Sequence, residues 1–278
     1  MSVAALPYTL LLLLGQFTAG SAFVLLAVQA RGTFEASFIR TCAWLTVSGA
    51  VLLTITALAI DPRPAVDSFP LSSDALLPIR AVSIALTLFS FAYVYFVRRD
   101  DEAFLAVATG ATCAGLGVLA LVLMADLVHR PAWSFAGPLL TLLAGAVTLG
   151  TATIAMVWGH WYLVNPRLPE APLNEITLVT AGALVVELLV TALNAVIPAA
   201  QKIHSDALLA VSLPSNPAFW LRVVIGLIFP AVLVFMAYKS STERAMMSAT
   251  GLLYIAVGAI LAGEALGRGL LFVTGAAV

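Results

Sequence analysis

The last apolar stretch of the chain holds an acid and a base, Glu264 and Arg268, four residues apart. That spacing puts both side chains on one face of an α-helix, where they can pair. Charged groups inside an apolar helix are costly in lipid, so this face must meet protein or water. Two interpretations stay open. The two charges only neutralise each other, or they bind a polar ligand and stabilise negative charge that develops on it.

Other polar residues interrupt the remaining apolar stretches, and each is a candidate for chemistry. They are Gln16, Arg80, Asp126, His129, Glu187, Asn194 and Arg222. Gln16 belongs to a residue type that also joins helices by hydrogen bonds without any ligand. Glu187 has no charged partner in its own stretch, so we expect it to be protonated or bonded to another helix.

The composition of the chain explains why such residues are costly. Of its 278 residues, 62% are hydrophobic and 10% are charged, and the mean hydropathy is +1.07. A soluble domain keeps many more polar residues at its surface, so the bilayer must be the solvent. The net charge of −1 gives no indication of a nucleic-acid partner.

Eight apolar stretches are long enough to cross a bilayer, which takes about 20 residues each. Proline-rich or charged segments separate them, and they lack the alternation of barrel strands. The sequence therefore predicts an all-α, polytopic membrane protein with a single helical-bundle domain over residues 1–278. The predicted spans are 8–30, 41–60, 76–97, 103–128, 137–164, 173–197, 219–238 and 245–273.

The basic residues of the loops predict the orientation of the helices. Loops after odd-numbered helices carry seven: Arg31, Arg40, Arg98, Arg99, Arg167, Lys239 and Arg244. Loops after even-numbered helices carry three: Arg63, Arg130 and Lys202. Because cytoplasmic loops are richer in Lys and Arg, we expect both termini on the outer, periplasmic side.

This orientation gives each polar residue a depth. Eight of them, from six helices, are predicted to share one level just beneath the outer face, with Glu187 near the middle of the membrane. The eight are Gln16, Arg80, Asp126, His129, Asn194, Arg222, Glu264 and Arg268. Arg80, Asp126, His129 and Arg222 lie close to helix ends, so each can also snorkel to the headgroups.

Metal and heme chemistry have little support in the residues. The three histidines are His129, His160 and His204, and the predicted topology places no two of them at matching depth on facing helices. We therefore expect no heme and no metal site, with a pair of His129 and His204 on the outer side as the one alternative for a heme. Cys42 and Cys113 are too few to hold an iron–sulfur cluster alone. Nucleophile motifs and phosphate-binding loops are also absent from the sequence.

Two segments resemble the membrane anchor subunits of bacterial dimethyl sulfoxide reductases, which are related to polysulfide reductase-type anchors. They are GQFTAG at 15–20 and AGEALGRG at 262–269, in the first and last helices. The middle of the chain departs from the family. The resemblance implies a heme-free, menaquinol-oxidising subunit of the inner membrane. In the family, electrons pass to an iron–sulfur subunit and then to a molybdopterin catalytic subunit.

With this resemblance, the candidate residues divide into two groups. Gln16, Arg80, Glu264 and Arg268 are the candidates for quinone binding, and Asp126, His129 and Glu187 for proton transfer. Two other functions stay open. One is a structural or assembly subunit of a respiratory or photosynthetic complex. The other is a small-solute transporter, which the scarcity of charge at mid-membrane disfavours.

Overall fold

The computed structural model describes residues 3–165, 167–201 and 213–278. Within them, eight helices are long and apolar enough to cross a membrane, so the prediction of a multi-pass, all-α membrane protein is confirmed. Lys202 and His204 lie outside the described residues. The helices are α1 (Leu6–Arg31), α2 (Ala36–Ala59), α3 (Leu76–Phe96), α4 (Ala103–Val128), α5 (Ala136–Val164), α6 (Ala171–Val196), α7 (Pro217–Val223), α8 (Phe229–Thr242) and α9 (Met246–Thr274).

Among the spans that the structure describes, the seventh is the one that joins two α-helices. A π-helix, η5 (Val224–Ile228), joins α7 to α8 into one continuous span, Pro217–Thr242. Elsewhere the predicted ends agree with the observed ones to within a few residues. Short 3-10 helices flank several spans: η1 (Val3–Ala5), η2 (Ser73–Ala75), η3 (Asp100–Glu102) and η4 (Leu213–Ser215).

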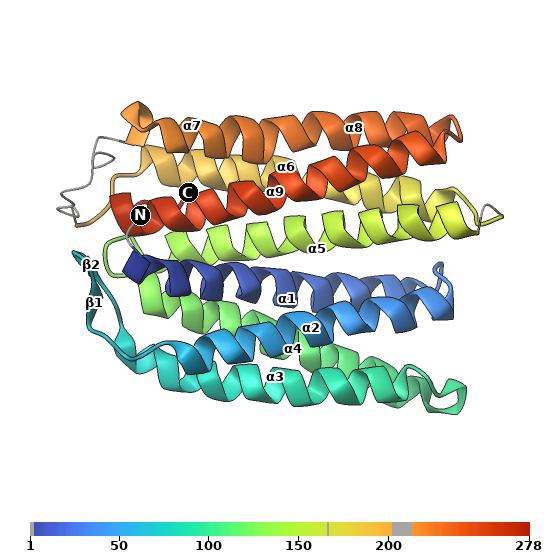
Figure 1. The fold of residues 1–278 in the computed structure, drawn as a ribbon, viewed down its shortest axis with the longest axis horizontal. Helices are drawn as coiled ribbons and strands as arrows, with labels where there is room; N and C mark the ends of the chain where they lie inside the picture. The colour runs from blue at the N-terminus through green and yellow to red at the C-terminus, as the bar shows by residue number, and fades with distance from the viewer. Residues whose placement is uncertain (1–2, 166, 202–212) are drawn as a thin grey trace.

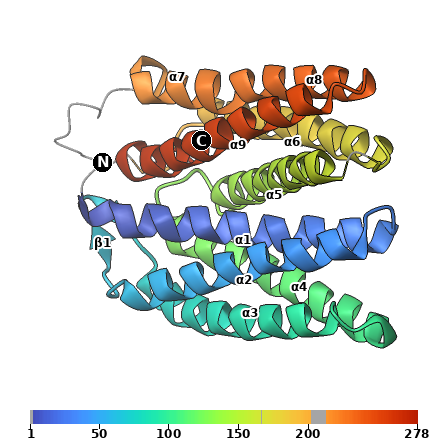
Figure 2. The same cartoon turned by 45° about the vertical axis from the view of Figure 1, so that its right-hand side comes forward.

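The helices form two halves that lie side by side (Figures 1 and 2). The first half holds α1 to α4, and the second holds α5 to α9. Helix α1 lies at the junction, because it packs on α2 and α4 in its own half and on α5 and α9 in the other. A polar group on the inner face of α1 can therefore reach the second half of the molecule.

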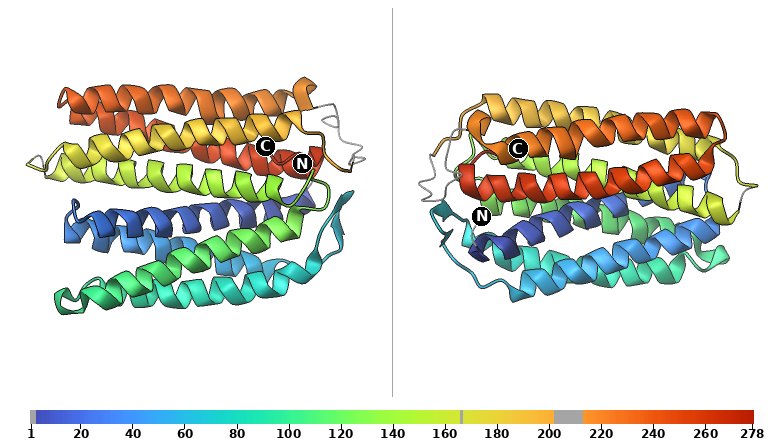
Figure 3. Two further views of the ribbon diagram at one scale, coloured as in Figure 1. Left: turned by 180° about the vertical axis from the view of Figure 1, so that it is seen from behind. Right: turned by 45° about the horizontal axis from the view of Figure 1, so that its top comes forward.

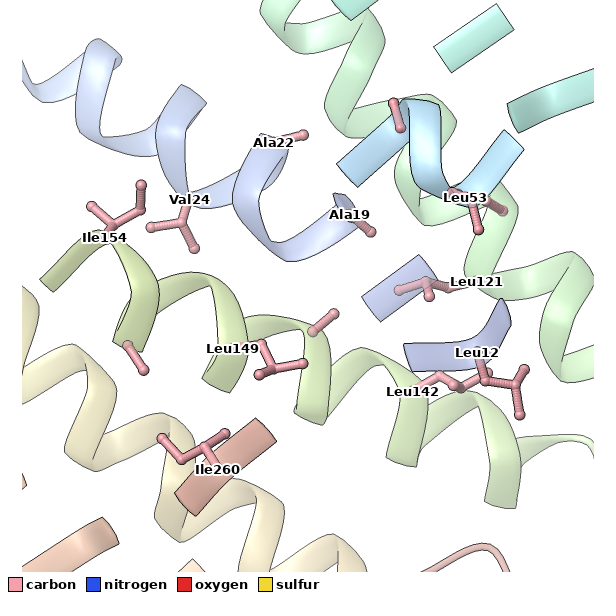
Figure 4. Packing of buried hydrophobic residues seen from close by; sticks show 14 of the residues in the cluster. Leu12, Ala19, Ala22, Val24, Leu53, Leu121, Leu142, Leu149, Ile154 and Ile260 are labelled. Carbon is pink, nitrogen blue, oxygen red and sulfur yellow. The ribbon is translucent and has the colours of Figure 1, made fainter. Parts of the chain in front are cut away.

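The junction is tight because two glycines let the backbones of α1 and α5 touch. A Cβ atom on Gly20 would lie 1.8 Å from the carbonyl oxygen of Ala146, and one on Gly150 would lie 2.4 Å from that of Gly20. Such approach is typical of helices packed in lipid, where small residues allow close contact. Figure 4 shows Leu142, Leu149 and Ile154 of α5 in the apolar core around this crossing.

Both termini lie at one end of the bundle, which we call the terminal end; the other is the opposite end (Figures 1 and 3). A two-stranded antiparallel hairpin, β1 (Ala65–Val66) and β2 (Phe69–Pro70), covers part of the terminal end between α2 and α3. It is anchored by Phe69, whose ring centroid lies 4.9 Å from that of Phe272. The predicted positions of both termini on one side of the bundle agree with this arrangement.

Candidate functional site

Glu264 is the centre of a buried ionic network that crosses the junction between the halves. Its Oε2 accepts hydrogen bonds from Gln16 Nε2 of α1 at 2.6 Å and from Arg268 Nη2, one turn along α9, at 3.0 Å. Its Oε1 accepts from Arg222 Nη2 of α7 at 2.5 Å. The side chains of Glu264 and Arg222 are fully buried, so none of these bonds competes with bulk water.

Arg222 extends the network to a fourth helix. The same Nη2 that bonds to Glu264 also donates to Oε1 of Glu187 on α6, so two carboxylates share one guanidinium nitrogen. Together with Arg268, the network holds two formal positive and two formal negative charges. This balance matters because a single unpaired charge buried in protein is far more costly than a balanced group.

Gly145 on α5 provides the space for the central contact. A Cβ atom there would lie 2.1 Å from Gln16 Nε2 and 2.3 Å from Glu264 Oε2. A side chain of any size at this position would therefore push the amide and the carboxylate apart. Five helices, namely α1, α5, α6, α7 and α9, thus meet at the network.

The π-helix begins two residues after Arg222, at Val224, and lies against α9. Its wider turn changes the direction in which side chains leave the seventh span, and such turns occur often at functional sites. Where η5 crosses α9, a Cβ on Gly226 would lie 2.6 Å from the Cα of Gly263. The close crossing brings Arg222 to the face of α9 that carries Glu264.

Glu187 lies at the level of the rest of the network. At 1.5 Å per residue, Gln16 is about 20 Å along α1 from the first described residue at the terminal end. Glu187 and Glu264 are each about 14–15 Å from the terminal end of their helices. The two carboxylates therefore share one level, whereas the topology predicted that Glu187 would lie apart. The expectation that Glu187 bonds to another helix is confirmed.

Several polar atoms of the network have no hydrogen-bond partner among the described residues. They are Gln16 Oε1, Glu187 Oε2, Arg222 Nε and Nη1, and Arg268 Nε. Buried polar atoms are rarely left unpaired in proteins, so each needs an explanation, such as a bound ligand or a water. These unpaired atoms include hydrogen-bond donors and acceptors. A small polar group that both donates and accepts hydrogen bonds would therefore satisfy them.

A second polar chain lies between the network and the terminal end. Trp133 Nε1 donates to Asn194 Oδ1 at 2.7 Å, and Asn194 Nδ2 donates to the hydroxyl of Thr141 at 2.7 Å. Thr141 lies one turn before Gly145 on α5. Asn194 was predicted to share one level with Glu264, but it belongs to this separate layer.

The remaining candidates have other partners. Arg80 donates to the carbonyl oxygens of Ala57 at 3.0 Å and Ile60 at 2.5 Å, so it caps the end of α2. His129 Nδ1 lies 3.5 Å from a carboxylate oxygen of Asp126, and both side chains are partly exposed near the terminal end. The structure therefore brings together Gln16, Glu187, Glu264 and Arg268, and leaves these three outside the network.

Arg222 contacts Glu264, as the predicted shared level allows, but its central place in the network was not predicted. Its position near a helix start left snorkelling open, yet its side chain is completely buried. A signal was present in the sequence: Gly263 and Gly267 flank Glu264 on the adjacent helix, and a Cβ on either would come within 3.1 Å of the Arg222 guanidinium. Glycines around a buried acid leave room for a long basic side chain.

No model of a known protein family matches the chain, and no curated protein sequence matches it either. Within the residues that the structure describes, no group of three or more His, Cys, Asp or Glu side chains is placed to hold a metal ion. The fold and the network therefore define the class of protein: a multi-pass helical membrane protein with a charge-balanced network buried between its two halves.

Proposed function

We propose that this chain is the membrane anchor and quinol-handling subunit of a multi-subunit respiratory oxidoreductase in the bacterial inner membrane. It would bind menaquinol or the corresponding quinone toward the outer face and pass electrons to an iron–sulfur partner subunit. The observation that carries the proposal is the buried network, whose arginines keep unpaired donors beside two carboxylates. That set matches the two oxygens of a quinone ring and the protons that they exchange.

Each group of the network has a distinct part in this proposal. Oxidation of one quinol releases two electrons and two protons. The guanidinium groups of Arg222 and Arg268 would donate to the quinone oxygens and stabilise negative charge as a proton leaves. The unpaired Oε2 of Glu187 would accept the first proton, pass it on toward the terminal end and then accept the second. In this proposal the two electrons pass to the iron–sulfur centre of the partner subunit.

Protons would leave toward the terminal end. Thr141 and Asn194 form a hydrogen-bonded layer on that side of the network, and Asp126 and His129 lie partly exposed near the same end. Asp126 and His129 keep their proposed role in proton release. Arg80 is no longer proposed as a quinone ligand, because its guanidinium is occupied by the carbonyl groups of α2.

An apolar groove beside the network suits the long isoprenoid tail of a quinol. The groove lies between α5 and α6, has a volume of about 400 Å³ and is lined almost entirely by aliphatic side chains. Ala144 is part of its wall and directly precedes Gly145, against which Gln16 and Glu264 pack. The polar ring of a quinol could therefore lie at the network while its apolar tail lies in the neighbouring groove.

A structural subunit without quinol chemistry is the second candidate. It is favoured by the burial and the charge balance of the network. The side chains of Glu187, Arg222 and Glu264 are fully buried, and the charges balance without a ligand. A balanced ionic network can fix the relative position of helices and do nothing else. In that case the protein would copurify with partner subunits but bind no quinone.

Purification from native membranes tests the proposal. We expect a complex that contains an iron–sulfur subunit, a molybdopterin subunit and about one extractable quinone per copy of this chain. Quinone content is measured by solvent extraction and chromatography. Partners without quinone would support the structural alternative, and a lone chain that conducts a solute in vesicles would support a transporter.

The side of the membrane needs its own test. A reporter inserted at Ser68, in the exposed turn of the hairpin, should be read as external, and one at 98–102 as cytoplasmic. The turn is a better position than the end of the chain, because Val278 is fully buried. The reverse pattern would place the network toward the cytoplasm and remove the outer-face part of the proposal.

A further inference from the structure

Residues 275–278 turn back into the bundle after α9 ends. Gly275 takes the left-handed conformation, with φ of 75°, which reverses the direction of the chain. Ala277 and Val278 are then buried, at 1% and 0% exposure. Figure 1 marks the C-terminus alongside α9, short of the end of that helix. The chain after α9 therefore packs into the bundle instead of leading away from it.

The segment fills a position between the polar layer and the ionic network. The hydroxyl of Thr141 lies 2.7 Å from the carbonyl oxygen of Ala277, within hydrogen-bonding distance. The side chain of Val278 packs in an apolar cluster with Phe219 and Leu270. At Gly267, the Cβ position lies 2.6 Å from the carbonyl oxygen of Val278 and 3.0 Å from Arg222 Nε. Arg222 Nε is one of the unpaired donors.

We propose that residues 275–278 are a removable plug, and that the position it fills is where the polar head of the ligand binds. The plug places a carbonyl oxygen on Thr141 and an apolar group between α7 and α9, next to an arginine with free donors. A ring that carries carbonyl oxygens can make the same contacts. That the ligand is a quinone rests on the proposed function, whereas the plug rests on the geometry alone.

Release of the plug leaves few groups unsatisfied. The hydroxyl of Thr141 also lies 3.0 Å from the carbonyl of Gly137 in its own helix, so it keeps an acceptor. Within the described residues, the other hydrogen bonds of 276–278 are local, from Ala276 N to Thr274 Oγ1 and from Val278 N to the carbonyl of Ala276. Local bonds can persist when the segment leaves. The plug is thus held mainly by burial of small apolar side chains.

Thiol labelling tests the plug without any assumption about quinol. The probe is Leu270→Cys, a position covered by Val278, in a background that carries Cys42→Ala and Cys113→Ala. We expect removal of 276–278 to speed alkylation by N-ethylmaleimide at least tenfold in membrane vesicles. As a matched control, Ser90→Cys, buried on α3 in the other half, should keep its rate.

A second variant keeps the chain length, in case the deletion does not fold. In Gly275→Val a β-branched residue replaces glycine at positive φ, which disfavours the turn. Alkylation of Cys at 270 should again rise, by a smaller factor. Equal rates with and without the plug would overturn the proposal. So would a parallel rise at position 90, because the deletion would then have loosened the whole bundle.

The nature of the ligand is tested on the same deletion variant. A short-chain menaquinone analogue should slow alkylation at position 270 at least threefold when 276–278 are removed. Faster labelling without any protection by the analogue would keep the plug and reject a quinone as the group that takes its place. The two labelling results therefore distinguish an error in the proposed quinone function from an error in the proposed plug.

Discussion

The buried network and the ion pairs of the opposite end use the same residue types in different surroundings. At the opposite end, Arg31 and Glu175 lie 2.9 Å apart, with side chains 60% and 51% exposed. In the network, Glu264 makes contacts of similar length with no exposure at all. Solvent screens the first pair, so it contributes at most about 1 kcal/mol. The network is buried in protein, so the loss of one charged partner there costs several times more free energy.

The comparison teaches that burial, and not the count of ion pairs, makes a charged group informative in this molecule. Arg31 and Glu175 join α1 to α6 across the same junction that the network crosses. They need no space made for them, whereas the network needs Gly145 on α5 and the wide turn of η5. A site for which several helices leave space is a stronger candidate for function than an ion pair at the surface.

Loss of Arg222 should give the largest effect on stability. Arg222→Gln leaves Glu187 and Glu264 buried together with only Arg268 for balance, so we expect a loss of about 3–5 kcal/mol in the free energy of unfolding. Reversible SDS denaturation followed by circular dichroism measures it. The double variant Glu187→Gln with Arg222→Gln restores the balance and should recover most of the loss. A stable single variant would mean that the bridge contributes little.

Crowding the network should cost less. Gly145→Ala puts a methyl group where the amide of Gln16 and the carboxylate of Glu264 now lie, so we expect a loss of about 1–3 kcal/mol from overpacking. The matched control is Gly182→Ala on α6, where a Cβ would meet nothing within 4 Å. The same denaturation assay compares them. Equal stability of the two variants would contradict the tight packing at Gly145.

Neutralising the exposed pair should give the smallest effect. The double variant Arg31→Gln with Glu175→Gln should change the free energy of unfolding by less than about 1 kcal/mol. The small change should shrink further in high salt, because both side chains are exposed. A loss as large as that of Arg222→Gln would show that exposure does not distinguish the two regions.

The fold was predictable because hydropathy alone defines the spans. Eight apolar stretches with charged or proline-rich breaks lead to eight helices, and their ends agree with the observed ones to within a few residues. Sidedness stays a prediction that rests on the distribution of basic residues among the loops. Helix neighbours were not predictable, because the small residues that decide them, such as Gly20 and Gly150, occur in most of the spans.

The site was predictable in part. Depth from topology correctly grouped Gln16, Glu264 and Arg268, since residues at one level on packed helices can meet. It also grouped Arg222 correctly with Glu264, although the position of Arg222 near the start of its helix left snorkelling open. It failed for Arg80, whose side chain turns to the end of α2. Depth is a property of the backbone, and long basic side chains extend several ångströms from it. The burial of residues 276–278 had no signal in composition or spacing.

The most direct test of the central claim is quinol oxidation by the double variant Glu264→Gln with Arg268→Gln. The variant removes one charge of each sign, so Arg222 and Glu187 keep a balanced pair and the complex should still assemble. We predict normal assembly and quinol turnover lowered at least tenfold, or about 1.4 kcal/mol in transition-state stabilisation. The control is Arg31→Gln with Glu175→Gln, which should turn over quinol normally. Wild-type turnover by the network variant would contradict the account and leave these residues with a structural role only.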